Sequence, residues 1–394
     1  NKMSIQKLFR PDVLAMQAYH VADAAGFIKL DAMENPYRLP EPLRSELGQT
    51  LADVALNRYP DPHGDGLKEQ LKAAFAIPAA ADVILGNGSD EIITLITQAL
   101  AAPDIVVMAL EPSFVMYKLN AQFSRVRYVG VPLAADFSLD LPATLAAIAS
   151  QQPAVVFVSY PNNPTGPRFA RTEVQAILDA APGLVVVDEA YQAFADDSFM
   201  DLAGSHERLI VMRTLSKLGL AGLRLGYAAG HPEVIAQLDK VRPPYNINVL
   251  TQAAAKFALR HIEVFDAQAA ELRRERERLA AALGALPQLK VFPSEANFLT
   301  VRVPDAPALF AALKEARIQA TDEIRARARS LLGQGVLGMW VFSFLAMQFD
   351  AANLTGTPRA EWFITWLPIA LVSISVWARA KPDACDKVAA LPNQ

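Results

Sequence analysis

The chain has 394 residues, more than the roughly 250 to 300 that one hydrophobic core usually supports, so two packed domains are expected. Its net charge of −4, with acidic and basic residues interspersed along most of its length, offers no basic face for nucleic acid. A single cysteine, Cys385, excludes an intramolecular disulfide and a multi-cysteine metal site, and the five histidines show no paired ligand spacing. We therefore expect small-molecule partners and no bound metal.

The N-terminal part of the chain predicts an arm followed by turns. No apolar run long enough for a secretory signal precedes Arg10-Pro11-Asp12, so a cytoplasmic protein is expected. Residues 11–30 form the expected arm, which carries Tyr19, and residues 31–37 form a turn into the main body because proline and asparagine favour turns. Residues 58–66 contain two prolines and two glycines, so we predict a loop there, followed by a helix from Leu67.

From residue 83 to residue 230, short β-branched runs alternate with longer helical patterns. Near-continuous apolar strands separated by helices predict a mostly parallel sheet that helices cover on both faces. This is the expected large α/β domain. The predicted strands are residues 83–85, 105–108, 126–131, 155–158, 184–187 and 209–212.

The following segment predicts a smaller domain. Residues 271–279 alternate opposite charges at helical spacing, which is typical of an exposed helix face. Residues 290–292 and 297–303 are predicted strands. We therefore divide the chain into an arm with part of the small domain (1–40), a large domain (41–245), a small domain (246–318) and a hydrophobic tail (319–394).

Lys217 has the most informative surroundings in the sequence, MRTLSKLGLAGLR at residues 212–224. An isolated lysine is usually a surface charge, but this one directly follows the hydroxyl residues Thr214 and Ser216 and precedes Arg224, from which two glycines separate it. That pattern is typical of a Schiff-base lysine beside a phosphate site. We predict that Lys217 binds pyridoxal phosphate covalently and moves a proton at the substrate Cα.

Other residues supply what the pyridoxal ring requires. Asp188 ends the apolar strand LVVVD, and open α/β sheets bind ligands at the carboxyl ends of their strands, so its carboxylate can pair with the ring nitrogen. The alternative is an ordinary acid in a strand-to-helix loop. Tyr191 and Asn163 can donate hydrogen bonds to the ring oxygen, and Phe114 can stack on the ring or be a core aromatic. We predict Lys217, Asp188 and Tyr191 to be catalytic.

A glycine turn, GNGSDE at residues 86–91, joins a predicted strand to a predicted helix. Its backbone amides can face an anion at the positive end of that helix. Together with two hydroxyls and a guanidinium that can bind bidentately, they complete a phosphate site. The residues predicted to form it are Gly88, Ser89, Asp90, Thr214, Ser216 and Arg224.

In this set and order, the motifs resemble the fold-type I, pyridoxal-phosphate-dependent aminotransferases over about residues 11 to 318, and most closely the histidinol-phosphate branch. The motifs that carry the resemblance are YH (19–20), DAMENPY (31–37), RYP (58–60), GSDE (88–91), YPNNPTG (160–166), DEAY (188–191) and RTLSK (213–217).

The resemblance implies a large domain with a mostly parallel sheet plus a smaller α+β domain. It also implies amino transfer between histidinol phosphate and 2-oxoglutarate, yielding glutamate, in histidine biosynthesis. A homodimer is implied as well, in which Tyr59 reaches the neighbouring cofactor phosphate, and Tyr19 and Asn35 contact substrate. Two alternatives stay open: another aminotransferase or phospho-amino-acid decarboxylase on the same scaffold, and a catalytically impaired fusion that only binds the cofactor.

The tail departs from the family pattern, because no arginine-containing strand follows Ile318. Instead, residues 331–348 and 362–378 carry no formal charge, and their lengths are close to the roughly 17 to 25 residues that span a bilayer. Basic residues flank the pair at both ends, which fits a hairpin with both ends in the cytosol. Membrane association is thus expected only through residues 331–378. Three hypotheses remain: a membrane anchor, a divergent small-domain ending and, favoured by the abrupt stop of the pattern, a foreign segment joined to a truncated gene.

Overall fold

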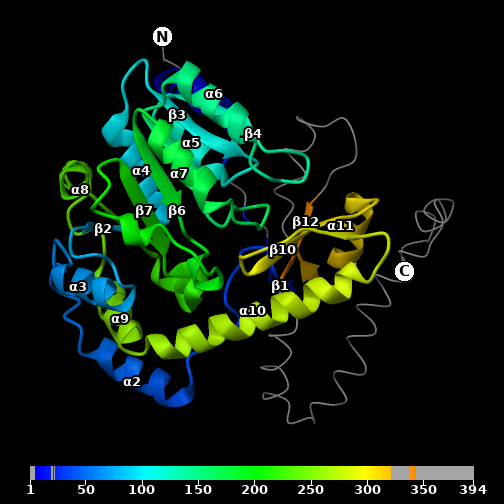
Figure 1. The fold of residues 1–394 in the computed structure, drawn as a ribbon. Helices are drawn as coiled ribbons and strands as arrows, with labels where there is room; N and C mark the ends of the chain where they lie inside the picture. The colour runs from blue at the N-terminus through cyan, green and yellow to red at the C-terminus, as the bar shows by residue number, and fades with distance from the viewer. Residues whose placement is uncertain (1–4, 19–20, 22, 321–337, 343–394) are drawn as a thin grey trace.

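A seven-stranded sheet forms the centre of the large domain (Figure 1). The computed structural model describes residues 5–18, 21, 23–320 and 338–342. The strand order is β2-β8-β7-β6-β5-β3-β4, and neighbouring strands are parallel except β8, which is antiparallel to both β2 and β7. The strands are β2 (Asp82–Asn87), β3 (Val106–Glu111), β4 (Arg127–Pro132), β5 (Val155–Ser159), β6 (Leu184–Asp188), β7 (Leu209–Thr214) and β8 (Leu225–Gly230).

Helices cover both faces of this sheet. In β5, Val156 and Val158 face one core while Val155 and Phe157 face the other. Because both faces are buried, the central strands are apolar without alternation, as the sequence predicted. One core includes α3 (Asp65–Ala74), α6 (Leu141–Gln151), α7 (Arg171–Ala180) and α9 (Val249–Arg260); the other includes α4 (Ser89–Leu100), α5 (Val115–Phe123) and α8 (Pro232–Asp239).

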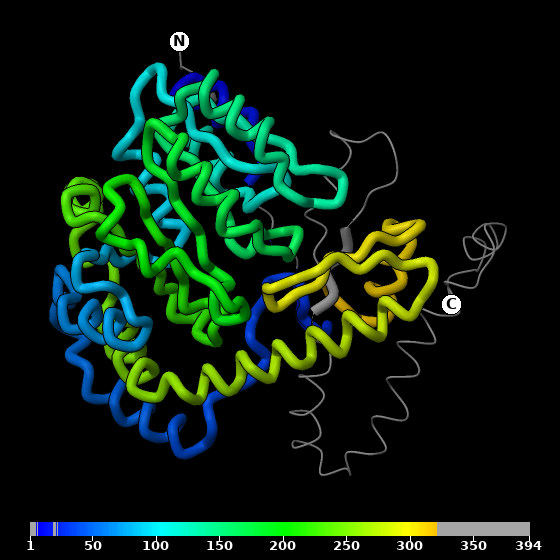
Figure 2. Tube along the Cα trace, in the orientation of Figure 1, coloured from blue at the N-terminus to red at the C-terminus, as the bar shows by residue number. Residues whose placement is uncertain are grey.

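The long helix α10 (Ile262–Gly284) runs from the large domain to the small one (Figure 2). There, β10 (Phe298–Arg302) pairs antiparallel with β9 (Lys290–Val291) and with β12 (Gly338–Phe342), and α11 (Ala306–Glu315) lies beside them. The N-terminal segment joins this domain through β1 (Ile28–Lys29), which pairs parallel with β11 (Ile318–Gln319). The domain bounds at residues 40, 245 and 318 stay a prediction.

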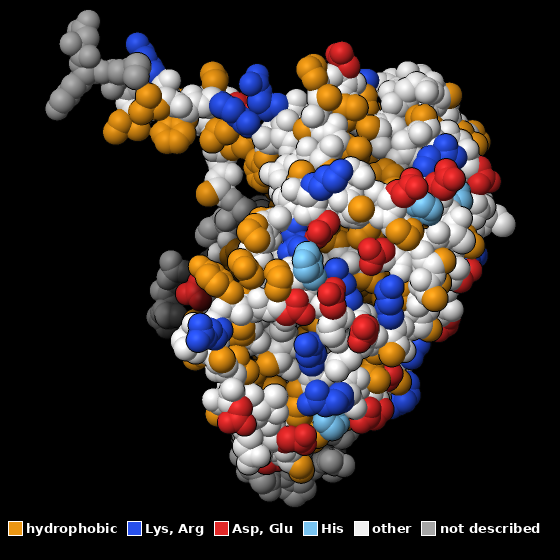
Figure 3. Space-filling model, turned by 90° about the vertical axis from the view of Figure 1, so that its left-hand side faces the viewer, with side chains coloured by type: hydrophobic (Ala, Val, Ile, Leu, Met, Phe, Trp, Pro, Cys, Tyr) orange, Lys and Arg blue, Asp and Glu red, His pale blue; other side chains and the backbone are white. Residues whose placement is uncertain are grey.

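The remaining elements are short or lie at the periphery. Helix α1 (Pro11–Ala15) belongs to the predicted arm, and α2 (Glu41–Ala52) packs on α9. Short helical turns are η1 (Ile5–Leu8), η2 (Gln192–Phe194), η3 (Met200–Leu202), η4 (Ser216–Leu220) and η5 (Ala221–Leu223). On the face shown in Figure 3, positive and negative side chains are intermingled.

The predicted α/β class with a mostly parallel sheet is confirmed, and each of the six predicted strands overlaps one of β2 to β7. Strand β8 was missed because its sequence, LGYAAG, contains no β-branched residue.

The tail is described only at residues 338–342, which form β12 within the first uncharged stretch. Its pairing with β10 fits the hypothesis of a small-domain ending and gives no support to a membrane helix there. Among the helices in the described ranges, none has the length and apolarity needed to cross a membrane. The rest of the predicted hairpin, including residues 362–378, lies outside the described residues.

Candidate active site

A cavity of about 580 Å³ opens at the carboxyl ends of the central strands, between the large domain, the small domain and the N-terminal segment. Strands β5, β6 and β7 each end there, at Ser159, Asp188 and Thr214. The carboxyl edge of a parallel sheet is where such folds bind ligands. The predicted cofactor residues that line this cavity are Ser89, Asp90, Phe114, Asn163, Asp188, Tyr191, Thr214, Ser216, Lys217 and Arg224.

Lys217 lies in η4, directly after β7, and its side chain crosses the cavity towards the N-terminal segment. Its Nζ donates a hydrogen bond to the backbone oxygen of Ala32 at 2.8 Å and lies 5.7 Å from the centre of the Tyr191 ring. The amine is thereby held inside the cavity. A lysine in this position can attack a carbonyl carbon of a bound cofactor and can later transfer a proton.

Asp188 is a buried carboxylate, 3% exposed, at the end of β6. Its Oδ2 accepts a hydrogen bond from the Tyr117 hydroxyl at 2.6 Å, and its Oδ1 accepts one from the Ala190 amide at 3.1 Å. Burial raises the pKa of Asp188 to about 6, although these two hydrogen bonds act in the opposite direction. A buried carboxylate of this kind favours a positively charged partner, such as a protonated pyridine nitrogen.

Asn163 and Tyr191 approach each other in the same cavity. The Asn163 amide nitrogen donates to the Tyr191 hydroxyl at 3.2 Å, and Tyr191 is buried. Both groups are therefore oriented before any ligand arrives. The Phe114 side chain lines the cavity and meets the buried Tyr117 ring edge to face, at 5.7 Å between centroids and 86°. Its predicted stacking role is compatible with this place and stays a prediction.

The glycine turn and Arg224 form one structural unit. Gly88 has φ 81°, and a Cβ at this position would lie 2.5 Å from the Nη2 atom of Arg224. Glycine is therefore needed for the guanidinium to approach the start of α4. The Arg224 side chain is held by Asp90, with 3.1 Å between Nη2 and Oδ2. A guanidinium beside a helix N-terminus offers charge and amide donors to an anion.

Two hydroxyls complete this donor set. The Thr214 hydroxyl donates to Ser216 Oγ at 2.9 Å and accepts from the Ser216 amide at 3.1 Å. Hydroxyl, amide and guanidinium donors are the groups that proteins use for phosphate. The residues present therefore fit pyridoxal phosphate: a phosphate site, a buried carboxylate and an amine line the same cavity.

Comparison with known proteins agrees with this chemistry. The family model of the class I and II aminotransferases matches residues 25–329. The chain belongs to this aminotransferase family. The match extends about eleven residues beyond residue 318, where the resemblance inferred from the sequence ends.

This aminotransferase has close relatives among bacterial proteins. It is 71% identical over 317 residues to the histidinol-phosphate aminotransferase of Chromobacterium violaceum, covering 80% of this chain and 89% of the relative. It is 59% identical over 317 residues to histidinol-phosphate aminotransferase 1 of Ralstonia nicotianae, covering 79% and 85% of the two chains. The resemblance inferred from the motifs is confirmed.

Solved structures share the aminotransferase's fold. Histidinol-phosphate aminotransferase from Sinorhizobium meliloti, in complex with pyridoxal-5'-phosphate, superposes with a TM-score of 0.75 at 22% identity, covering 88% of this chain and 96% of that one. L-threonine-O-3-phosphate decarboxylase from Porphyromonas gingivalis superposes with a TM-score of 0.65 at 21% identity, covering 83% and 99%. The fold-type I class is thereby confirmed, and the family membership agrees with the expected cofactor.

Some predicted site residues of the aminotransferase do not line this cavity, among them Tyr59 and Asn35. Tyr59 is 81% exposed and stacks on Tyr245, with ring centroids 4.6 Å apart, in a separate surface hollow. Asn35 donates to the Leu218 backbone oxygen and so braces the Lys217 turn, without lining the cavity. Tyr19 lies outside the described residues. The roles of all three stay predictions.

Sequence reasoning missed two kinds of site residue. Tyr117 holds the Asp188 carboxylate, yet its signal was only its spacing of three residues from Phe114 on α5. Lys29 and Lys314 line the small-domain end of the cavity, and no local motif distinguishes them from surface lysines.

Proposed function

We propose that this protein is a pyridoxal-phosphate-dependent histidinol-phosphate aminotransferase, which exchanges an amino group between histidinol phosphate and 2-oxoglutarate in histidine biosynthesis. The observation that carries the proposal is the single cavity that brings Lys217, Asp188 and the phosphate donors together. The choice of substrate rests on relatives of that name at up to 71% identity.

Bound pyridoxal phosphate supplies an electron sink for the electrons of the broken Cα–H bond. Lys217 binds the cofactor and moves the proton at the substrate Cα. Asp188 stabilises positive charge on the ring nitrogen, and Asn163 and Tyr191 orient the ring oxygen. Thr214, Ser216 and Arg224, with the turn at the start of α4, hold the phosphate.

The small-domain end of the cavity suits an anionic substrate. Lys29 and Lys314 both line it. Lys29 is held by Asp31 and Glu34, with its Nζ 3.2 and 2.8 Å from their carboxylate oxygens, whereas Lys314 is exposed on α11. We infer that Lys314 attracts the phosphate of histidinol phosphate, because a dianion near an ammonium group gains Coulomb energy.

A homodimer is part of the proposal. The hollow around Tyr59 contains exposed apolar groups, Leu56 and Tyr245 among them, together with Arg58. A second copy of the chain would cover these groups and bring Tyr59 and Arg58 to a neighbouring phosphate. We also place the enzyme in the cytoplasm, where amino-acid biosynthesis takes place.

The competing activity is decarboxylation of a phospho-amino acid. A decarboxylase shares the fold, at 21% identity, and the cavity chemistry would serve either reaction. The two differ in product, since decarboxylation releases carbon dioxide and transfers no amino group to 2-oxoglutarate.

The test is the absorption spectrum of the protein loaded with pyridoxal phosphate, before and after adding histidinol phosphate without an acceptor. We expect the band of the lysine-bound cofactor to be replaced by that of the aminated cofactor. If the band of the lysine-bound cofactor forms but never converts, amino transfer is refuted. The hypothesis of a fusion that only binds the cofactor would then remain. Carbon dioxide released from a phospho-amino acid would establish the decarboxylase.

A further inference from the structure

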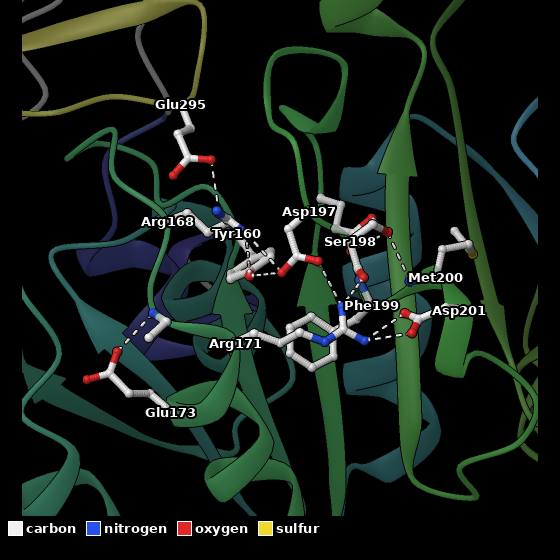
Figure 4. Close-up of polar contacts among 12 residues, drawn as sticks. Tyr160, Arg168, Arg171, Glu173, Asp197, Ser198, Phe199, Met200, Asp201 and Glu295 are labelled. Carbon is white, nitrogen blue, oxygen red and sulfur yellow. Dashed lines mark hydrogen bonds and ion pairs between the residues drawn. The ribbon is translucent and has the colours of Figure 1, made fainter.

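A polar network connects the small domain to the large domain beside the active site (Figure 4). Its central residue is Arg168, in the segment between the 160–166 loop and α7. The Nε atom of Arg168 lies 2.9 Å from Oε2 of Glu295, which belongs to the turn between β9 and β10 of the small domain. The two side chains are 25% and 33% exposed, so the ion pair is largely shielded.

Arg168 is held in this orientation from the other side by Asp197. Its Nη1 lies 2.9 Å from Asp197 Oδ2, which also accepts a hydrogen bond from the Tyr160 hydroxyl at 2.7 Å. The second Asp197 oxygen accepts from Arg171 Nη1 at 2.9 Å, and Arg171 in turn pairs with Asp201. The guanidinium of Arg168 therefore spans two carboxylates from different domains, and only Glu295 belongs to the small one.

The same small-domain turn touches the loop that carries Asn163. The Glu295 amide donates to the Gly166 backbone oxygen at 2.9 Å, and the Thr300 hydroxyl donates to that of Pro164 at 2.8 Å. Gly166 has φ 97°, and a Cβ there would lie 2.9 Å from the Ser294 side chain, so loop and turn are in close contact. The turn therefore contacts the loop directly, and the loop is also held from the large domain by the hydrogen bond from the Asn163 backbone amide to Ser159 Oγ at 3.1 Å.

We propose that Arg168 and Glu295 are positioning residues whose ion pair presses the small-domain turn against the 163–166 loop and so fixes Asn163 in the cofactor cavity. Without the Glu295 carboxylate, Arg168 keeps only its contacts with Asp197 and the Tyr160 hydroxyl, both in the large domain, and loses its ion pair with the small domain. The side-chain amide of Asn163, which donates a hydrogen bond in the cavity, then no longer has a fixed position. This inference rests on the proposed function, in which Asn163 meets the cofactor.

The test compares Glu295→Gln, Asn163→Ala and the double variant, each loaded with pyridoxal phosphate. The readouts are the midpoint pH of the cofactor absorbance change and the KM and kcat for histidinol phosphate. Glu41→Gln is the matched control, because it breaks an exposed ion pair with Arg44, 3.0 Å long, on helix α2, which packs on α9. Arg168→Lys keeps the positive charge. A lysine ammonium group lacks the planar fork of N–H donors with which the guanidinium binds the carboxylates of Asp197 and Glu295 together.

We expect Glu295→Gln to shift the midpoint in the same direction as Asn163→Ala and to raise KM about two- to fivefold, as for loss of a partly exposed ion pair. The double variant should match Asn163→Ala alone, and Arg168→Lys should shift the midpoint in the same direction. The inference is overturned if Glu295→Gln behaves as Glu41→Gln does, or if the effects of the two substitutions multiply. The midpoint pH of the absorbance change can be measured whenever the cofactor is bound, even without amino transfer. Absence of amino transfer in the unaltered protein would therefore refute the proposed function separately from this inference.

Discussion

Asp188 is predicted to destabilise the cofactor-free protein at neutral pH. Burial raises its pKa from 3.8 to about 6, so the folded protein binds this proton more tightly than the unfolded chain does. The contribution of Asp188 to the free energy of unfolding is therefore most favourable below about pH 4, falls as the pH rises towards 6 and stays low above it. A shift of roughly two pKa units, at about 1.36 kcal/mol each, amounts to about 3 kcal/mol at pH 7 and above.

Replacing Asp188 by asparagine removes this charge while keeping the shape. The amide oxygen can still accept from Tyr117, but its NH₂ group cannot accept from the Ala190 amide, which costs about 1 kcal/mol. We expect cofactor-free Asp188→Asn to be more stable than the unaltered protein by about 2 kcal/mol at pH 8. At pH 5 the advantage should be about 1.4 kcal/mol smaller, since part of the native Asp188 is then protonated.

The assay is urea unfolding of the cofactor-free proteins at pH 5 and pH 8. Asp53→Asn, at an exposed carboxyl after α2, is the control for the same substitution at the surface. The reasoning is refuted if the advantage of Asp188→Asn is the same at both pH values. Loaded with pyridoxal phosphate, the variant should lose this advantage, because it cannot stabilise the positively charged ring nitrogen.

Three further substitutions test the other groups of the site. Lys217→Ala should abolish the absorption band of the covalently bound cofactor and lower kcat by at least about a hundredfold, as for loss of a general base; an unchanged spectrum would show that the nucleophile is another residue. Arg224→Ala should weaken pyridoxal phosphate binding about 10- to 100-fold in a fluorescence titration, because a charge-assisted hydrogen bond contributes about 1.5 to 3 kcal/mol. Lys314→Met should raise KM for histidinol phosphate about three- to fivefold with little change in kcat, and an unaltered KM would exclude Lys314 from substrate binding.

Local patterns in the sequence determined the class of fold and most of the cofactor cavity. Buried strands of a mostly parallel sheet are continuous apolar runs, so β2, β3, β5, β6 and β7 could be recognised one by one. The glycine turn at residues 86–91 and the Lys217 segment are each a few consecutive residues, so their predicted roles could be inferred from local order alone. Because the carboxyl ends of parallel strands meet at one edge, residues following different strands could be assigned to the same cavity before any coordinates were known.

Contacts between distant segments were decided only by the tertiary structure. The hydrogen bond from Tyr117 to Asp188, the ion pair of Arg168 with Glu295 and the place of Lys314 beside the cavity depend on contacts that no local motif predicts. Strand β8 also depends on tertiary structure. Its sequence has little strand preference of its own, and it forms a strand because it pairs with β2 on one side and β7 on the other. Periodicity and turn chemistry act over a few residues, whereas packing brings together side chains that are far apart in the chain, and their partners depend on the whole arrangement of the domains.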